Sequence, residues 1–300
     1  MSVDSPTATS TLGGAVRQLL GSSRPVSWVN TAYPFGAAYL VAGGELDPVF
    51  WCGVVYFLVP YNLLMYGVND VFDYESDLRN PRKGGVEGVV LQDRWHRLTL
   101  LVAVVSNVPF LLLLTAAGTP ISSAALAVVV FAVVAYSAPR LRFKERPLID
   151  SVTSSTHFAG PAVFGYLVVS PGMSGSTLAV FVAFFLWGTA SHAFGAVQDI
   201  RADKAAGIAS VATWLGAGAT VRLALVGYSA AGLLLLVGTT WPGRLAALLT
   251  LPYLLNIWPF RSLAERDCES ANAGWRRFLV LNYVTGFLVT QLLIWVTLGG

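Results

Sequence analysis

Three aspartates, Asp70, Asp73 and Asp77, directly follow an apolar stretch of the chain. Their spacing places them on one face of a helix, with Asn69 beside them and Tyr66 one turn earlier. Carboxylates stacked in this way repel one another, and at a membrane boundary the repulsion is costly unless a cation removes it. Mg²⁺ accepts carboxylate oxygens and keeps positions open for water or phosphate. The spacing therefore predicts that these aspartates hold magnesium.

A second pair of aspartates, Asp199 and Asp203, follows a later apolar stretch. The two residues are one helical turn apart, so they share a face and form a second set of candidate metal ligands. The alternative is that each acid pairs with a neighbouring base, as Asp77 would with Arg79 or Arg82. Two such sets, both at the ends of apolar segments and each followed by bases, favour the metal site over this alternative.

Basic residues follow both acidic sets and also lie between them. The segment "YSAPRLRFKERP" carries Arg142 and Lys144, while Arg82, Lys83 and Lys204 come directly after the aspartates. An anion held by magnesium needs further positive charge, which these side chains supply. Acids for a metal, bases for an anion and an apolar interior predict a site for a diphosphate with a hydrocarbon tail. The metal-bridged diphosphate would be the leaving group.

Loss of such a diphosphate would leave a carbocation, which aromatic faces stabilise. Tyr66 and Tyr136 are candidates for this role, although tyrosines are also common at membrane interfaces for other reasons. A reaction through such a cation ends in loss of a proton or capture of water. His157 and His192 are candidates for the base. The alternative for each is a histidine that is simply hydrogen-bonded within the bundle.

The elements that carry these residues are expected to be membrane helices. Of the 300 residues, 55% are hydrophobic and 12% are charged, whereas a soluble domain has about 25% charged residues. The mean hydropathy is +0.64. The apolar runs predict an all-α integral membrane protein, with nine transmembrane helices in a bundle around a central cavity that faces the cytoplasm. The predicted spans are residues 26–43, 49–69, 98–117, 120–138, 149–169, 177–197, 219–238, 243–260 and 277–298.

The distribution of Lys and Arg predicts how the chain is oriented. Of the 19 such residues, only Arg244 falls at the connections that follow the first, third, fifth and seventh spans. Because cytoplasmic connections carry the excess of bases, the N-terminus is predicted to be cytoplasmic and the C-terminus to lie outside the cytoplasmic membrane. Residues 1–25 are predicted to be a flexible cytoplasmic leader, and residues 26–300 a single domain. A net charge of only +3 gives no support for nucleic-acid binding.

Three motifs resemble those of the intramembrane aromatic prenyltransferase superfamily, the UbiA-type family named for 4-hydroxybenzoate polyprenyltransferase. "NDVFDYESD" is similar to its NDxxDxxxD motif, and "DIRADKAAG" to its DxxxDxxxG motif, which ends here at Gly207. "YSAPRLRFKERP" is similar to its YSxP…RxK loop, through Tyr136, Ser137, Pro139, Arg142 and Lys144. The likeness runs from about residue 25 to the end of the chain. It implies nine helices, magnesium and a prenyl diphosphate.

The likeness also implies a role for each matching residue. The expected catalytic residues are Asp73, Asp199, Lys144 and Tyr136. The expected diphosphate-binding residues are Asn69, Arg82, Lys83, Arg142, Lys144 and Lys204. The expected metal ligands are Asp70, Asp73, Asp77, Asp199 and Asp203.

The continuation of the first motif, "LRNPRKGGVEGVVL", differs from the Arg-Pro-rich sequence that is common in the family. It resembles the branch of lycopene elongases, which take part in C50 carotenoid synthesis. That likeness implies dimethylallyl diphosphate as donor, lycopene as acceptor, the lipid bilayer as surroundings and room for carotenoid-pathway partner subunits. The alternatives are an aromatic or tetrapyrrole acceptor and, more distantly, a cation-coupled transporter. Transporters place such acids near the bilayer midplane, whereas both sets here fall at the predicted cytoplasmic ends of spans.

Overall fold

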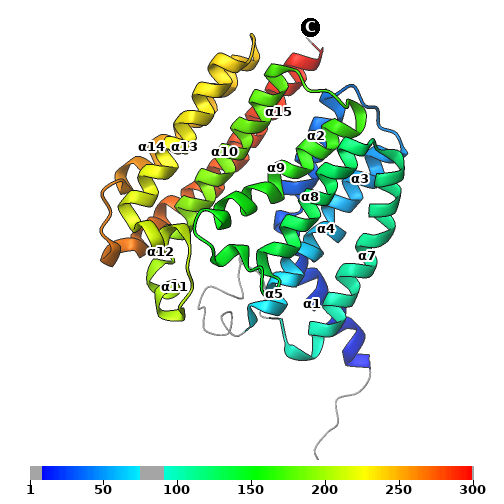
Figure 1. Ribbon diagram of the computed structural model, residues 1–300, viewed down its shortest axis with the longest axis horizontal. Coiled ribbons are helices and arrows are strands. Elements are labelled where there is room, and N and C mark those ends of the chain that lie inside the picture. The colour runs from blue at the N-terminus through cyan, green and yellow to red at the C-terminus, as the bar shows by residue number, and fades with distance from the viewer. Residues whose placement is uncertain (1–8, 75–90, 299–300) are drawn as a thin grey trace, which may run out of the picture.

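The computed structural model describes residues 9–74 and 91–298, and within these ranges the chain is helical and has no strands. The long helices stand side by side (Figure 1). The α-helices, long and short, are α1 (Thr9–Ser23), α2 (Val29–Val41), α3 (Pro48–Leu58), α4 (Pro60–Asn62), α5 (Val68–Phe72), α7 (His96–Ala117), α8 (Pro120–Ser137), α9 (Ile149–Val169), α10 (Gly175–Val197), α11 (Ile200–Ala206), α12 (Val211–Leu215), α13 (Ala217–Gly238), α14 (Leu251–Ile257) and α15 (Asn272–Leu298). The prediction of an all-α protein is confirmed for the described residues.

Within the described ranges, six helical stretches are long and apolar enough to cross a membrane. They are Pro48–Phe72, Asp93–Ala117, Pro120–Ser137, Gly175–Val197, Ala217–Gly238 and Glu265–Thr297. The remaining predicted spans correspond to α2, α9 and the stretch from η5 (Gly243–Thr250) through α14. Because α2 has only 13 residues and α9 begins with a run of polar side chains, neither resembles an ordinary apolar span. The six long apolar stretches are typical of a protein that crosses the membrane several times.

Two clusters of buried apolar side chains hold the helices together. In the first, the rings of Phe35, Phe57 and Phe164 join α2, α3 and α9, with centroids 5.2 to 5.9 Å apart. In the second, Tyr228 of α13 stacks on Tyr253 of α14 with centroids 5.4 Å apart. Aromatic pairs at such distances contribute beyond the area they bury. The chain therefore packs as an N-terminal and a C-terminal group of helices.

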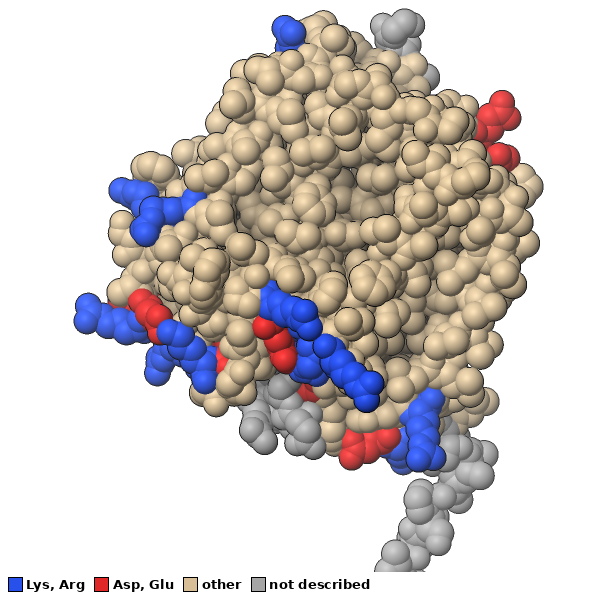
Figure 2. All heavy atoms as spheres, viewed as in Figure 1, with Lys and Arg blue, Asp and Glu red and all other residues tan. Residues whose placement is uncertain are grey.

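The two helices that carry the aspartate motifs are anchored in different clusters. Val68 fixes α5 in the first cluster, and the fully buried Ile200 fixes α11 in the second. Both helices nevertheless lie at the same end of the bundle, opposite the C-terminus (Figure 1). Most charged side chains on the visible face gather along this edge, below a hollowed surface with few charged side chains (Figure 2). The fold thus brings candidate metal and phosphate ligands to one end of an apolar bundle.

The span that leads to α5 changes its helical type shortly before the aspartates. Pro60 has no backbone N–H and interrupts the helix after α3. The buried Asn62 side chain donates to the carbonyls of Phe57 and Leu58 at 2.7 and 3.1 Å, and so satisfies acceptors at the break. The next residues, Leu63–Gly67, form the π-helix η2. Single π turns inside α-helices are frequent at functional sites.

Residues 9–23 differ from the flexible leader that the sequence predicted. They form α1, which packs against η2. Its last turn is buried at Ser22 and Ser23, and the Trp28 Nε1–H donates to the Ser23 carbonyl at 2.9 Å. A short helix rich in Gly, Ser and Thr depends on such tertiary contacts, because its own propensity is weak. The packing of α1 fixes the position of the residue that follows it, Arg24.

Candidate active site

Asp70 lies in α5 with its side chain fully buried. Its Oδ1 is 3.3 Å from a guanidinium nitrogen of Arg24. The same guanidinium lies over the ring of Tyr66, 4.2 Å from the ring centroid. The sequence predicted that Asp70 and Tyr66 share a face, and the structure confirms that one cation contacts both. A buried carboxylate needs such a partner, because an unpaired charge in the interior is very costly.

Asp73 ends α5 at the point where three elements meet. Its Oδ2 accepts a hydrogen bond from Asn69 Nδ2 at 2.7 Å. Its Oδ1 forms ion pairs with Lys144 and, at 3.6 Å, with Arg142. Asn69 also donates to the hydroxyl of Ser137 at 3.0 Å. The first aspartate motif is therefore in direct contact with the basic segment between α8 and α9.

The basic segment has an unusual backbone. It contains three non-glycine residues with positive φ, namely Arg140 (74°), Arg142 (39°) and Leu148 (70°). Such conformations are costly for these residues and tend to occur where side chains must be aimed at a site. The ion pair between Arg142 and Glu145 raises the pKa of the arginine and lowers that of the glutamate. Burial lowers the pKa of Lys144 to about 8, against the opposing effect of Glu145 and Asp70.

The second aspartate motif is built around α11. Asp199 is the N-cap residue of this helix, and the Asp203 N–H donates to the Asp199 carbonyl at 2.8 Å. The helix ends at Gly207, whose φ of 71° lies in the left-handed region that glycine adopts without steric cost. The glycine that closes the motif thus terminates the helix that holds both aspartates.

Tyr136, near the end of α8, belongs to a polar network. Its hydroxyl is 3.2 Å from Nε2 of His192, whose Nδ1 is 3.1 Å from the hydroxyl of Ser151. The fully buried Asp150 accepts from the backbone N–H groups of Ser151 and Val211, both at 2.7 Å. Asp150 therefore joins the start of α9 to the segment that follows α11.

The predicted site residues are brought together in part. Asn69, Asp73, Arg142 and Lys144 form one contiguous cluster, and Asp70 lies one helical turn before Asp73 in ion-pair contact with Arg24. Asp203 lies in α11 and Asp199 caps it, at the same end of the bundle as α5 (Figure 1). Lys204 is elsewhere, with its Nζ 2.6 Å from Glu265 Oε1 in an exposed ion pair. Asp77, Arg82 and Lys83 lie outside the described residues. Within the described residues, no group of three or more His, Cys, Asp or Glu side chains is close enough to hold a metal ion.

Two residues of this site, Arg24 and Asp150, escaped the sequence analysis. Arg24 belonged to the predicted leader, and its only signal was a lone arginine before Pro25 at the start of an apolar run. Asp150 had the signal of a single acid at the cytoplasmic end of a predicted span, but no second acid at helical spacing marks it.

Arg24→Gln is expected to lower the stability of the folded protein by about 3 kcal/mol, because it removes a charged partner of the buried Asp70 carboxylate. Arg24→Lys should recover part of this loss, since it keeps the charge but not the planar geometry. The midpoint of thermal unfolding in detergent measures the stability of both variants. Arg17→Gln is a matched control, because Arg17 lies in α1 with an exposed side chain. Equal midpoints for Arg24→Gln and the unsubstituted chain would contradict the assignment.

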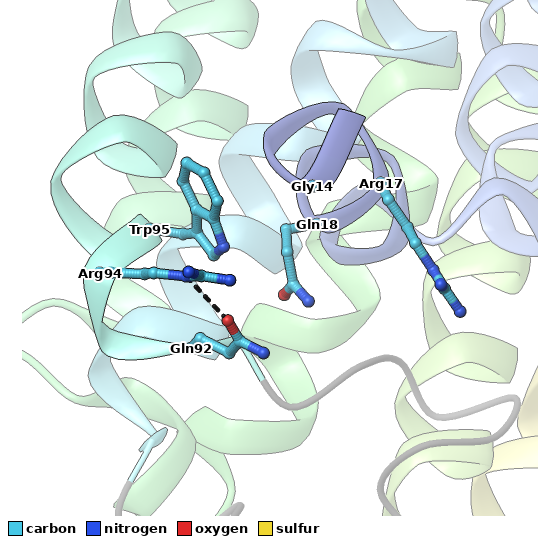
Figure 3. A pocket seen from close by; sticks show the side chains of 6 residues that line it. All are labelled: Gly14, Arg17, Gln18, Gln92, Arg94 and Trp95. Carbon is cyan, nitrogen blue, oxygen red and sulfur yellow. Dashed lines mark hydrogen bonds between the residues drawn. The ribbon is translucent and has the colours of Figure 1, made fainter. Parts of the chain in front are cut away.

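Two cavities lie apart from this cluster. One of about 350 Å³ lies between α1 and the residues just before α7, where Arg94 Nε donates to Gln92 Oε1 at 3.0 Å and Arg17 points away (Figure 3). It contains none of the predicted site residues. The other, also of about 350 Å³, lies between α8, α9 and α10, and its lining is apolar apart from Thr156. This second cavity, here named the apolar cavity, is suited to hydrocarbon.

The chain matches the model of the UbiA prenyltransferase family over residues 31–289. It is 54% identical over 282 residues to the C(50) beta-cyclic carotenoids biosynthesis protein LbtBC of Dietzia sp., a match that covers 94% of this chain and 65% of that protein. The chain therefore spans a little less than two thirds of the length of this relative. It is also 50% identical over 281 residues to the lycopene elongase/hydratase of Corynebacterium glutamicum, with 93% and 97% of the two chains covered.

The fold is that of a solved UbiA homolog from Archaeoglobus fulgidus, whose structure contains dimethylallyl diphosphate (DMAPP) and Mg²⁺. The TM-score is 0.64 at 17% sequence identity, and the match covers 89% of this chain and 98% of the homolog. The family match over most of the chain and the relative matched over 97% of its length agree with the three motifs and the ion-paired cluster. This chain belongs to the UbiA prenyltransferase family.

Proposed function

We propose that this prenyltransferase transfers the dimethylallyl group of dimethylallyl diphosphate to lycopene and releases pyrophosphate. The observation that carries the proposal is the identity of 50 to 54% with two relatives named for lycopene elongation and C50 carotenoid synthesis. The relative from C. glutamicum is matched over nearly its whole length, which supports a shared reaction. The continuation after the first motif, residues 78–91, resembles the same branch.

The charged cluster suits the diphosphate of the donor. Lys144 and Arg142 would bind its oxygens, because their cationic groups already lie beside Asp73 at the end of the bundle. Asn69 would orient Asp73 through the hydrogen bond between them. Arg82 and Lys83, outside the described residues, are proposed to add charge. Lys204 could contribute only after leaving its ion pair with Glu265.

The carboxylates fit magnesium by their chemistry. Mg²⁺ is commonly bound through one or two carboxylates together with substrate phosphate oxygens, so pairs of aspartates suffice where a diphosphate completes the shell. Asp70, Asp73 and Asp77 would hold the metal on one side, and Asp199 and Asp203 on the other. When bound, magnesium would stabilise the negative charge that develops on the departing pyrophosphate. The solved homolog with DMAPP and Mg²⁺ supports this cofactor.

The interior suits a hydrocarbon acceptor. The Tyr136 ring would face the allylic cation, while the hydrogen bond to His192 holds its hydroxyl in place. The apolar cavity offers one polar side chain, Thr156, whose hydroxyl donates to the carbonyl of Val152. A phenol or carboxylate acceptor would find no polar partner there, whereas a polyene needs none.

The proposed topology keeps nine spans, a cytoplasmic N-terminus and a C-terminus on the other side of the cell membrane, with the cavity open to the cytoplasm. It counts α2, α9 and the stretch from η5 through α14 as spans whose polar or broken sections are covered by neighbouring helices. The charged edge that contains α5 and α11 lies opposite the C-terminus, which supports this orientation (Figures 1 and 2). Partner subunits of the carotenoid pathway remain part of the proposal.

The function is tested with purified protein in detergent, Mg²⁺ and radiolabelled DMAPP, offered with either lycopene or 4-hydroxybenzoate. Label is expected in carotenoid products of higher mass, with pyrophosphate released in equal amount and both lost on addition of EDTA. Transfer of label to 4-hydroxybenzoate alone would overturn the lycopene assignment. Absence of any pyrophosphate release would instead favour a transporter.

A further inference from the structure

The two histidines of the interior differ in what their ring nitrogens contact. Both nitrogens of His192 are engaged, Nε2 with the Tyr136 hydroxyl and Nδ1 with the Ser151 hydroxyl. His157 is only 3% exposed, and its Nε2 has no hydrogen-bond partner among the described residues. A neutral imidazole that is protonated at Nδ1 carries a lone pair on Nε2, so an unpartnered Nε2 can accept a proton.

His157 lies next to the proposed position of the allylic cation. Its ring meets that of Tyr136 edge to face, with centroids 5.1 Å apart and an interplanar angle of 79°. Ser137, the residue after Tyr136, accepts from Asn69 of the donor site. Along α9, His157 is seven residues beyond Asp150, or about 10 Å farther from the charged end. The cation formed on the acceptor also lies farther from the diphosphate than C1 of the dimethylallyl group does. His157 is therefore displaced from the charged end in the same direction as this cation.

We propose that His157 is the base that receives the proton released when the coupling reaction ends. The inference rests on the proposed function. The C1–O bond of DMAPP breaks and pyrophosphate leaves with the electron pair, while the terminal double bond of lycopene forms the new bond to C1. The tertiary cation left on the acceptor loses a proton from a neighbouring carbon to Nε2 of His157, and the C–H electrons form a new double bond. If water adds instead, its proton goes to the same nitrogen, which later releases it to solvent.

The test uses His157→Asn and His157→Gln in the full-length protein in detergent, with Mg²⁺, labelled DMAPP and lycopene. The side-chain amide of Asn occupies the position of Nδ1, and that of Gln occupies the position of Nε2. Neither amide is basic. Elongated carotenoid is expected to form at least about 10²-fold more slowly in both, as for loss of a general base. The KM for DMAPP should change less than threefold. Without a base, the tertiary cation on the acceptor splits back into lycopene and the dimethylallyl cation, which water then captures. Pyrophosphate release should therefore exceed carotenoid formation, with dimethylallyl alcohol making up the difference.

A merely structural role of His157 would give a different pattern. Pyrophosphate release and carotenoid formation would then fall in equal proportion, and this result, like unchanged activity in both variants, would overturn the proposal. Val152→Ala, on the exposed face of α9, is the control and should retain activity. The unsubstituted chain separates this inference from the proposed function. If it releases pyrophosphate but makes no elongated carotenoid, the acceptor assignment fails before the role of His157 is tested.

Discussion

Replacing Asp73 with Asn should lower prenyl transfer by about 10³-fold while leaving the protein folded in the membrane. The amide has nearly the shape of the carboxylate but lacks its charge. Asp73 carries that charge at the contact between α5 and the basic segment, where it accepts from Asn69 and pairs with Lys144 and Arg142. The variant would lose a proposed magnesium ligand and the partner that orients both bases.

The measurement is pyrophosphate release and carotenoid formation at saturating Mg²⁺ and DMAPP, with size-exclusion chromatography to confirm folding. Asp93→Asn is the matched control, because Asp93 precedes α7 with its side chain 71% exposed and should keep full activity. Full activity of Asp73→Asn would remove the basis for a metal site at the first motif. A loss restored by higher Mg²⁺ concentration would identify Asp73 as a ligand that contributes to metal affinity.

Lys144→Met is expected to reduce kcat/KM for DMAPP by about 10²- to 10³-fold. The methionine fills a similar volume but cannot stabilise the charge that develops on the departing pyrophosphate. The ammonium group is well placed for this role, because its side chain is only 13% exposed and poorly solvated charges interact strongly. Lys144→Arg should recover only part of the activity, since a planar guanidinium does not replace a compact ammonium.

Arg146→Met provides the comparison within the same segment. Arg146 is exposed, and its guanidinium donates to the Arg140 carbonyl and lies over the ring of Phe143. Its removal should change kcat/KM by less than about twofold, as is usual for surface substitutions. If Arg146→Met and Lys144→Met lose activity equally, the effect belongs to the general charge of the segment and not to a diphosphate ligand at Lys144.

The motifs could be predicted from the sequence because helical spacing alone places Asp70 and Asp73, or Asp199 and Asp203, on one face. The family and the all-α fold that these motifs and the apolar runs predicted are confirmed. Contacts between distant segments could not be predicted in this way. The ion pair between Lys204 and Glu265 joins residues 61 positions apart, and no local pattern announces it.

The extent of the helices could be predicted only in part. The sequence predicted a span over 149–169, and a helix is there, but its polar first half becomes intelligible only from buried contacts such as Ser155 to the Phe185 carbonyl. The Ser/Thr/Gly composition of residues 9–23 predicted a flexible leader, whereas packing against η2 makes it a helix. Arg24 was missed for the same reason, because its role depends on where that packing places it. The roles of the individual site residues stay predictions.

The π-helix Leu63–Gly67 has a consequence for how this stretch tolerates changes in length. Each π turn closes its hydrogen bond over one more residue than an α turn, so η2 holds one surplus residue between α4 and α5. Deleting a residue there would let the helix relax to α geometry and keep Asp70 facing Arg24. Deleting one inside Val68–Phe72 would rotate the residues beyond it by about 100°. When related sequences are aligned, a one-residue gap before "VND" is therefore compatible with an intact site, and a gap within "VNDVFD" is not.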